Sequence, residues 1–78
     1  MSKFTPEQID KIAFSSRLRK RREEIKLTQE DIAGMVRASI DDYKNWERGI
    51  LIPNGFILMM LAGALSCDPD WLANGKGE

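Results

Sequence analysis

The chain has 78 residues, 42% of them hydrophobic, which suffices for one small domain whose core lies near the lower limit for independent stability. Twelve Lys and Arg side chains balance twelve Asp and Glu, so no overall basic excess attracts nucleic acid. One cysteine, Cys67, and no histidine exclude an intramolecular disulfide and argue against a zinc site. We expect Cys67 in or near the core, and no metal or cofactor.

The charge is unevenly distributed along the chain. Residues 1–27 hold eight basic and four acidic side chains, residues 28–49 hold three and five, and residues 50–78 hold one and three. The longest apolar run, 56–62, is far shorter than the ~20 residues that span a bilayer, and the chain does not open on an apolar signal segment. We expect a protein of the bacterial cytoplasm that does not enter a membrane.

Three segments carry the spacing of a helix start. Residues 5–8, 28–31 and 39–42 each place Thr or Ser three residues before Gln or Asp, an arrangement in which the hydroxyl caps the first turn. Gly49 and residues 53–55 are typical of helix ends and turns, and Asp68-Pro69 predicts one more cap. Because no stretch alternates convincingly at period two, the predicted fold class is all-α, a compact bundle of about five short helices.

The first helical tract is expected at about 6–25. Phe14, Leu18 and Ile25 share one face at helical spacing, and Arg22 lies on the flank of that face. This placement puts the Arg22 guanidinium beside the core rather than in water.

Two isoleucines near the start do not fit that face. Ile9 and Ile12 do not align with it, so we expect the tract to bend or break near 15–16. The predicted organisation is therefore an N-terminal helical arm, 1–13, followed by a helical domain, 14–78.

The next two helices are short and closely joined. Ile32, Ala33 and Val36 point inward from a helix at 29–36, and only two or three residues separate it from the helix that follows Ser39. Two short helices with so small a joint cross steeply, which is the arrangement of a helix-turn-helix. Its core is predicted at 28–49.

The helix after Ser39 has two different faces. Ile40, Tyr43 and Trp46 or Glu47 recur at core spacing. On the other face lies a polar stripe at i, i+3, i+4 and i+7: Asp41, Lys44, Asn45 and Arg48.

The segment "LTQEDIAGMVRASIDDYKNWERG", 27–49, resembles the signature of the Cro and CI repressor-like helix-turn-helix family, also called the XRE family. The resemblance extends more loosely over 14–72 and implies a lambda-repressor-like fold. Two positions depart from it. Arg37 replaces a usual turn glycine, which suggests a different turn backbone, and Tyr43 replaces a usual β-branched residue, which suggests a bulkier core.

In that family the second motif helix lies in the DNA major groove and the first crosses the phosphate backbone. The resemblance and the basic run near the N-terminus together give the expected contacts. Base contacts are expected from Ile40, Asp41, Lys44 and Asn45. Phosphate contacts are expected from Arg17, Arg19, Gln29, Ser39 and Arg48. The resemblance also implies a structural ion pair between Arg22 and Glu47.

Several of these residues have alternative interpretations. The basic run at 17–22 is also consistent with a solvated surface, and Gln29 with a simple helix-start residue. Trp46 and Trp71 are candidates for stacking on single-stranded nucleic acid, although their spacing favours the core.

The two aspartates need separate explanations, because a carboxylate close to DNA is repelled by phosphate. Asp42 completes the helix start with Ser39. Asp41 either accepts from cytosine N4 or orients Lys44 or Asn45. A further alternative is that this face binds a protein.

The segment at 53–67 is more apolar than one core-facing helix requires. Leu58, Leu61, Ala62 and Leu65 form one face, and a second apolar face contains Phe56, Met59 and Met60. We expect Phe56, Met59 and Met60 to form a homodimer interface, the alternative being a central helix covered by the N-terminal arm.

The expected function is a DNA-binding transcriptional regulator, a dimeric phage or prophage Cro-like or CI-like repressor that occupies a palindromic double-stranded operator. With no histidine, glycine phosphate loop or clustered carboxylates, we expect no enzyme, and no small-molecule ligand or separate inducer domain. The alternatives are a protein-interaction adaptor built on the same helices, an autoregulating antitoxin, and a restriction-modification controller.

Overall fold

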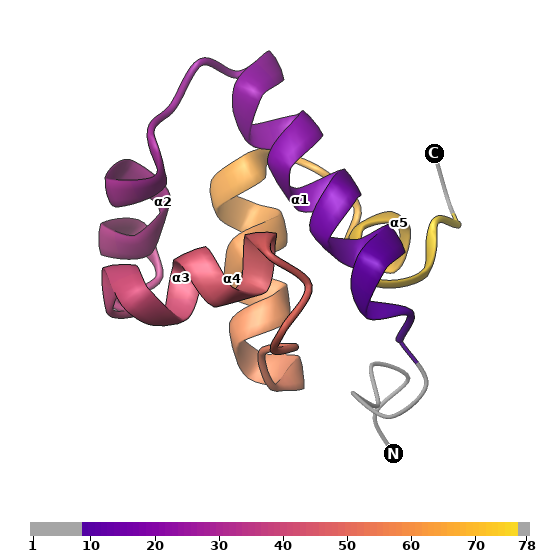
Figure 1. Cartoon of the computed structure of the whole chain (residues 1–78). Helices are drawn as coiled ribbons and strands as arrows, with labels where there is room; N and C mark the ends of the chain where they lie inside the picture. Colours follow the sequence, from indigo (N-terminus) through magenta and orange to yellow (C-terminus); the bar gives the residue numbers. More distant parts are fainter. Residues whose placement is uncertain (1–8, 77–78) are drawn as a thin grey trace.

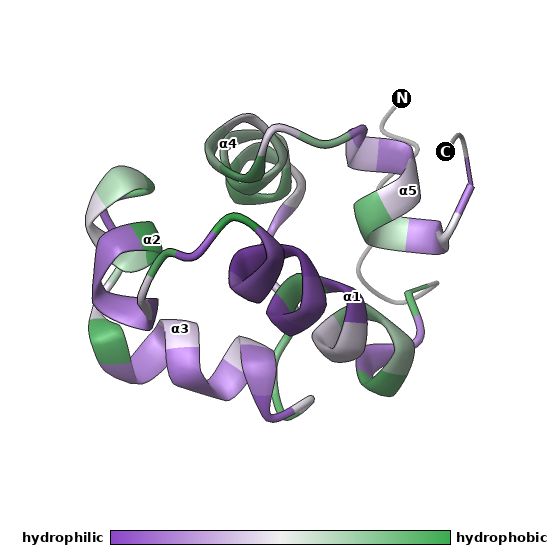
Figure 2. Ribbon diagram, turned by 90° about the horizontal axis from the view of Figure 1, so that it is seen from above, coloured by the Kyte–Doolittle hydropathy of each residue, from purple (hydrophilic) through white to green (hydrophobic). Residues whose placement is uncertain are grey.

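The computed structural model describes residues 9–76, and this part of the chain contains helices but no strand. The helices are α1 (Lys11–Glu24), α2 (Gln29–Met35), α3 (Ile40–Glu47), α4 (Gly55–Leu65) and α5 (Pro69–Asn74). Both ribbon views place α1 between α3 and α5, while α4 packs against α2 and α5 (Figure 1, Figure 2). The all-α prediction of about five short helices is confirmed. Within residues 9–76, none of the helices combines the length and the apolar character that a membrane crossing requires.

One core joins all five helices. Its largest fully buried side chains come from every helix: Phe14, Leu18, Ile32, Tyr43, Leu58, Leu61, Leu65 and Leu72. Burying each large apolar side chain contributes about 1.5–3 kcal/mol, so this cluster supplies most of the driving force for folding. Trp46 is also buried and meets the Tyr43 ring edge-on, with ring centroids 5.8 Å apart. Trp46 is therefore a core residue, and the stacking alternative for it was wrong.

Side-chain caps begin α2 and α3 where the sequence predicted them. Thr28 forms a complete capping box, since its Oγ1 accepts from the Asp31 N–H at 3.0 Å and Asp31 Oδ2 accepts from the Thr28 N–H at 2.9 Å. Ser39 Oγ accepts from the Asp42 N–H at 3.0 Å, but no bond returns from the Asp42 carboxylate in this described segment. Asp42 thus supplies only half of the expected box. The predicted cap at 5–8 lies outside the described residues.

The first helix does not bend at the position where the sequence predicted a bend. Asp10 caps α1, its Oδ1 accepting from the N–H groups of Ile12 and Ala13 at 3.0 and 3.1 Å, and Ile9 before it is buried. The helix then continues without a break through 15–16, so the bend expected there was wrong. The boundary expected between residues 13 and 14 falls inside α1.

The turn between α2 and α3 keeps an unusual backbone. Arg37 has a φ of 58°, in the left-handed region that normally favours glycine. The Arg37 N–H donates to Gly34 O at 3.2 Å and the Ala38 N–H to Ala33 O at 2.9 Å, which closes the end of α2. The different backbone expected for a turn without glycine was therefore wrong: arginine adopts the glycine-type conformation at some energetic cost.

The turn after α3 does use glycine. Gly49 has a φ of 76°, and a Cβ built there would lie 3.0 Å from the Ile12 side chain. The predicted C-terminal cap is confirmed, and its close approach fixes the end of α3 against α1.

Candidate nucleic-acid interface

The ribbon of α3 carries hydrophilic colour over most of its length (Figure 2). Tyr43, Trp46 and Glu47 face the interior and are buried. The opposite side carries the α3 stripe, in which Asp41 and Arg48 are exposed and Lys44 and Asn45 are half-buried: Asp41, Lys44, Asn45 and Arg48. Within it, Arg48 Nη1 donates to Asn45 Oδ1 over a long 3.4 Å. The stripe predicted from helical spacing is confirmed as a surface. Ile40 is half-buried against the core, which leaves part of its side chain at the start of this surface.

The last residue of α3 is a buried carboxylate. Glu47 is 3% exposed, and Arg22 of α1 grips it with two bonds, Nε to Oε2 at 2.6 Å and Nη2 to Oε1 at 3.1 Å. The Tyr43 hydroxyl donates to Oε2 at 2.6 Å, and Gln29 Nε2 of α2 donates to Oε1 at 3.0 Å. The predicted Arg22–Glu47 ion pair is confirmed. We call these four residues the Glu47 network; it joins α1, α2 and α3 at one point.

The electrostatics of this network favour the charged pair. Burial alone would raise the pKa of Glu47, but the hydrogen bonds from Arg22, Tyr43 and Gln29 outweigh it and hold the pKa below its usual value. The bond to Glu47 raises the pKa of Arg22, and burial raises that of the Tyr43 phenol. At neutral pH the network therefore contains a carboxylate, a guanidinium and a neutral hydroxyl. Every buried side-chain polar atom among the described residues has a hydrogen-bond partner, so the buried pair leaves no polar atom unsatisfied.

Two arginines of the basic run serve the fold. Arg17 donates from Nε to Leu72 O and from Nη2 to Ala73 O, both at 2.9 Å. Burial lowers the pKa of Arg17, and the nearby Asp10 carboxylate opposes this. Arg21 similarly donates to Leu65 O at 2.9 Å and Ser66 O at 2.8 Å.

These bonds connect α1 to the C-terminal ends of α5 and α4, where carbonyl groups lack helical partners and the helix dipole is negative. The expectation of a phosphate contact from Arg17 is corrected accordingly, because its guanidinium is held on the side of α1 that packs against α5.

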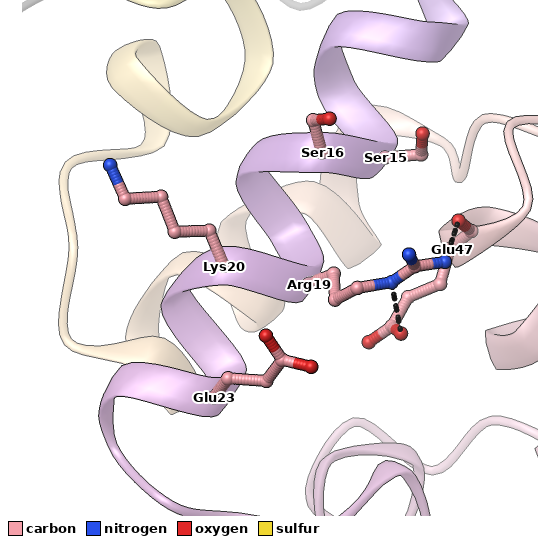
Figure 3. Close-up of a pocket in the computed structure, with 6 residues that line it drawn as sticks. All are labelled: Ser15, Ser16, Arg19, Lys20, Glu23 and Glu47. Carbon is pink, nitrogen blue, oxygen red and sulfur yellow. Dashed lines mark hydrogen bonds and ion pairs between the residues drawn. The ribbon is translucent and has the colours of Figure 1, made fainter.

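The remaining phosphate candidates lie close to α3. Arg19 is exposed, and its Nη2 donates to the backbone oxygen of Glu47 at 3.3 Å. Gln29 also contacts Glu47, while Ser39 and Arg48 cap the two ends of α3. Arg19 borders a depression of about 170 Å³ between α1 and the end of α3, shown in Figure 3 and lined by Ser15, Ser16, Arg19, Lys20, Glu23 and Glu47. The structure thus groups four of the five predicted phosphate contacts around one helix.

Several contacts at this site were not found by sequence reasoning. One is the Tyr43–Glu47 bond, which the i, i+4 spacing of a phenol and a carboxylate on one helix could have indicated. The local sequence gives no signal for the bonds of Gln29 and Arg19 to Glu47 or for the arginine–carbonyl bonds of Arg17 and Arg21.

Comparison with known proteins identifies the family. Residues 15–78 match a family of helix-turn-helix domains. The chain belongs to this helix-turn-helix family. Repressor protein C2 of Salmonella phage P22 is 41% identical over 62 residues, which are 80% of this chain and 29% of that protein. The HTH-type transcriptional regulator DicA of Escherichia coli K12 is 34% identical over 67 residues, which are 86% of this chain and 50% of that regulator. The chain therefore spans half or less of these curated relatives.

Solved structures of helix-turn-helix proteins are also similar. The P22 c2 repressor in complex with a synthetic operator has a TM-score of 0.76 and 38% identity, covering 81% of this chain and 96% of that one. The restriction-modification controller protein C.AhdI of Aeromonas hydrophila also has a TM-score of 0.76, with 30% identity, covering 81% of this chain and 91% of that one. The family and fold expected from the segment at 27–49 are confirmed.

This helix-turn-helix chain has a second surface feature away from the α3 stripe. Phe56 and Met59 of α4 are 74% and 51% exposed, and Met60 packs partly against the core. Ile50 and Leu51, in the loop that leads into α4, are exposed as well. Figure 2 shows hydrophobic colour over most of the α4 ribbon, in agreement with the second apolar face predicted from the sequence.

Proposed function

We propose that this chain binds double-stranded DNA sequence-specifically through α3 and, as a homodimer on a palindromic operator, represses transcription by excluding polymerase from an overlapping promoter. The observation that carries the proposal is the α3 stripe, a polar surface on the second helix of a helix-turn-helix whose orientation is fixed from beneath by the Glu47 network. The P22 c2 repressor, which shares this fold, has been solved with a synthetic operator. We place the protein in the bacterial cytoplasm, at the nucleoid when bound, and propose no catalytic activity.

The side chains of α3 match the chemistry of the major groove. A lysine such as Lys44 donates to guanine O6 and N7, and an asparagine such as Asn45 bridges adenine N6 and N7. The accessible part of Ile40 suits a thymine methyl group. Because the Arg48–Asn45 bond uses only one lone pair of Oδ1, the Asn45 amide retains an acceptor and both donors for a base.

The phosphate contacts are assigned to residues that flank α3. Arg19 and Arg48 supply charge, while Gln29 and Ser39 supply neutral hydrogen bonds. Gln29 has two N–H groups on its amide nitrogen, and the one that bonds Glu47 fixes the direction of the other. The buried carboxylate thus orients a phosphate donor as well as α3 itself.

A homodimer is proposed on the apolar residues around α4. Exposed Phe56 and Met59 lie next to half-buried Met60, and large exposed apolar side chains that lie together mark association surfaces. A two-fold dimer places two copies of α3 about 34 Å apart, one turn of the double helix, which matches a palindromic site.

DNA binding is tested by selecting duplexes from a random pool and measuring affinity by fluorescence anisotropy at several salt concentrations. With two phosphate-contacting arginines per copy and two copies, the slope of log K against log salt should be roughly −3.6, so that affinity falls about 150-fold between about 50 and 200 mM salt. Lys44→Ala should relax the base preference, whereas Arg48→Ala should weaken all sequences alike. Lys76→Ala, an exposed lysine after α5, is the matched control. No preference for any duplex at low salt would overturn the proposal.

Dimer formation is tested by sedimentation of the free protein. Phe56→Ser should raise the dimer dissociation constant about 10-fold or more, because it removes the most exposed aromatic side chain of the proposed interface. Met35→Ser, which changes an exposed apolar residue on α2, is the control and should leave association unchanged. A wild-type chain that stays monomeric, both free and on a palindromic duplex, would refute the dimer.

The C.AhdI similarity favours a second physiological role with the same chemistry, control of a restriction-modification operon. The position of the selected site relative to neighbouring genes distinguishes this role from phage repression. A protein-interaction adaptor remains the alternative if no duplex is selected.

A further inference from the structure

Asp41 is the acidic member of the α3 stripe, and attraction to DNA phosphate does not explain a carboxylate at this position. It lies in the first turn of α3 with an exposed side chain, on the same side of the helix as Lys44 and Asn45. A carboxylate placed near the phosphates lowers DNA affinity, so its presence requires a partner that offsets the repulsion.

The structure does not support an internal role for this carboxylate. Within residues 9–76, no hydrogen bond or ion pair joins Asp41 to Lys44 or Asn45, and the Asn45 oxygen accepts from Arg48 instead. The capping bond at the helix start does not use it either, because Ser39 caps the N–H of Asp42, and Asp41 adds only its charge at the positive end of the helix dipole. Both oxygens of Asp41 therefore make no internal hydrogen bond within residues 9–76, and the exposed side chain stays open to a partner of α3.

The chemistry of an ionised carboxylate narrows the choice of base. It has acceptors only, so in the major groove it fits the two amino donors, cytosine N4 and adenine N6, and is repelled by guanine O6 and N7 and thymine O4. Adenine presents its N7 acceptor beside N6, which also repels the carboxylate, whereas cytosine has no acceptor next to N4 on that edge. Cytosine is the best partner. Lys44, one turn along the same face, complements it by donating to a guanine.

We propose that Asp41 is a specificity-determining residue that selects a C·G base pair at one position of each operator half-site, its carboxylate accepting a hydrogen bond from cytosine N4. This inference rests on the proposed DNA binding by α3. The rest of the stripe supplies attraction, and Asp41 supplies discrimination, because guanine and thymine present only acceptors to its carboxylate and adenine presents the N7 acceptor beside its N6 donor.

The test compares duplexes selected by the wild-type chain, Asp41→Ala and Asp41→Asn. Wild type should require cytosine at one half-site position, with about a 10-fold or larger loss for any other base. Asp41→Ala should lose that requirement. Asp41→Asn should move the preference to adenine, since an amide both accepts from N6 and donates to N7. Asp42→Asn, an adjacent exposed carboxylate, is the matched control and should keep the cytosine, and circular dichroism confirms that each variant is folded.

A modified duplex tests the bond itself. Replacing the selected cytosine by 2-pyrimidinone, which lacks the 4-amino group, should weaken wild type about 10-fold and leave Asp41→Ala unaffected. If Asp41→Ala instead binds every duplex more tightly with an unchanged base preference, the carboxylate is merely repelled by DNA and the inference is overturned. If the wild-type chain selects no duplex at all, the proposed function itself fails. This result differs from a failure of the Asp41 inference alone, in which the wild-type chain still selects a duplex.

Discussion

Replacement of Glu47 by glutamine tests whether the Glu47 network holds α1, α2 and α3 together. The substitution keeps the size of the side chain but removes its charge. It also replaces one carboxylate oxygen by an amide NH₂ group, which cannot accept the hydrogen bonds that Arg22, Gln29 and Tyr43 donate. The guanidinium of Arg22, whose side chain is 13% exposed, is then left without its counter-ion. Breaking a buried pair from one side costs about 3–5 kcal/mol. A domain of this size has a total stability of roughly 4–12 kcal/mol, so the loss is a large fraction of the whole.

Urea denaturation at pH 7, followed by tryptophan fluorescence, measures this loss. Trp46 is a suitable reporter because it is buried one residue before Glu47. Glu30→Gln, an exposed glutamate in the first turn of α2, is the matched control and should stay within about 0.5 kcal/mol of wild type.

The pH dependence gives a second measurement with a defined sign. The pKa of Glu47 in the folded chain lies below its usual value, so its contribution to stability is complete above the unfolded pKa of about 4.3 and is lost as the pH falls from there toward the folded pKa. The bond from the Thr28 backbone also lowers the pKa of Asp31. Because wild type and Glu47→Gln both contain Asp31, its effect cancels in the difference between them. The difference in stability between wild type and Glu47→Gln should therefore shrink below about pH 5.

Two results would refute this reasoning. One is a Glu47→Gln variant whose unfolding free energy at pH 7 equals that of wild type within about 0.5 kcal/mol. The other is a large difference that stays constant from pH 7 down to pH 3, which would mean that the substitution acts through packing rather than through the charge of Glu47.

Three further substitutions probe separate parts of the site. Tyr43→Phe removes one donor to a carboxylate without changing the apolar core, and should lower the unfolding free energy in urea by about 1.5–3 kcal/mol; an unchanged midpoint would contradict the bond. Arg37→Gly removes the strain of a left-handed arginine, about 1–2 kcal/mol, but increases the chain entropy of the unfolded state, which costs about 0.5–1 kcal/mol. The melting temperature should therefore rise slightly rather than fall. Arg17→Met keeps the apolar stem and removes two carbonyl bonds, so thermal stability should fall while the salt slope of DNA binding is unchanged; a shallower slope would restore Arg17 to the phosphate contacts.

The features predicted correctly from the sequence are those decided by short-range rules. Caps at Thr28 and Ser39 follow from the residue types and their spacing, and the two faces of α3 follow from the helical repeat. The Arg22–Glu47 pair could also be predicted, because the flank position of Arg22 agreed with what the family resemblance implied.

The errors concern long-range contacts and backbone strain. Arg17 reaches carbonyl groups 55 and 56 residues away, and no local pattern distinguishes such an arginine from one that faces phosphate. The position of the α1 start was decided by the Asp10 cap and by the burial of Ile9 rather than by the repeat of apolar residues. At Arg37, the tertiary contacts of α2 and α3 impose a conformation that residue preference alone argues against.

The internal use of arginines also explains why a homodimer suits this chain. Of the basic residues at 17 and 19–22, Arg17, Arg21 and Arg22 are half-buried and bond to carbonyls or to Glu47. Arg19 and Lys20 are exposed, although Arg19 also donates to the backbone oxygen of Glu47 and lies 3.7 Å from its carboxylate. With zero net charge and few free cations near α3, a single copy releases few counter-ions and so gains little non-specific affinity. In the proposed homodimer, two copies on one palindrome would add both their phosphate contacts and their base contacts. Because each copy would hold DNA weakly by charge alone, base recognition would contribute a larger share of binding, and the base-selecting acceptor that we propose at Asp41 would then be tolerated within the same surface.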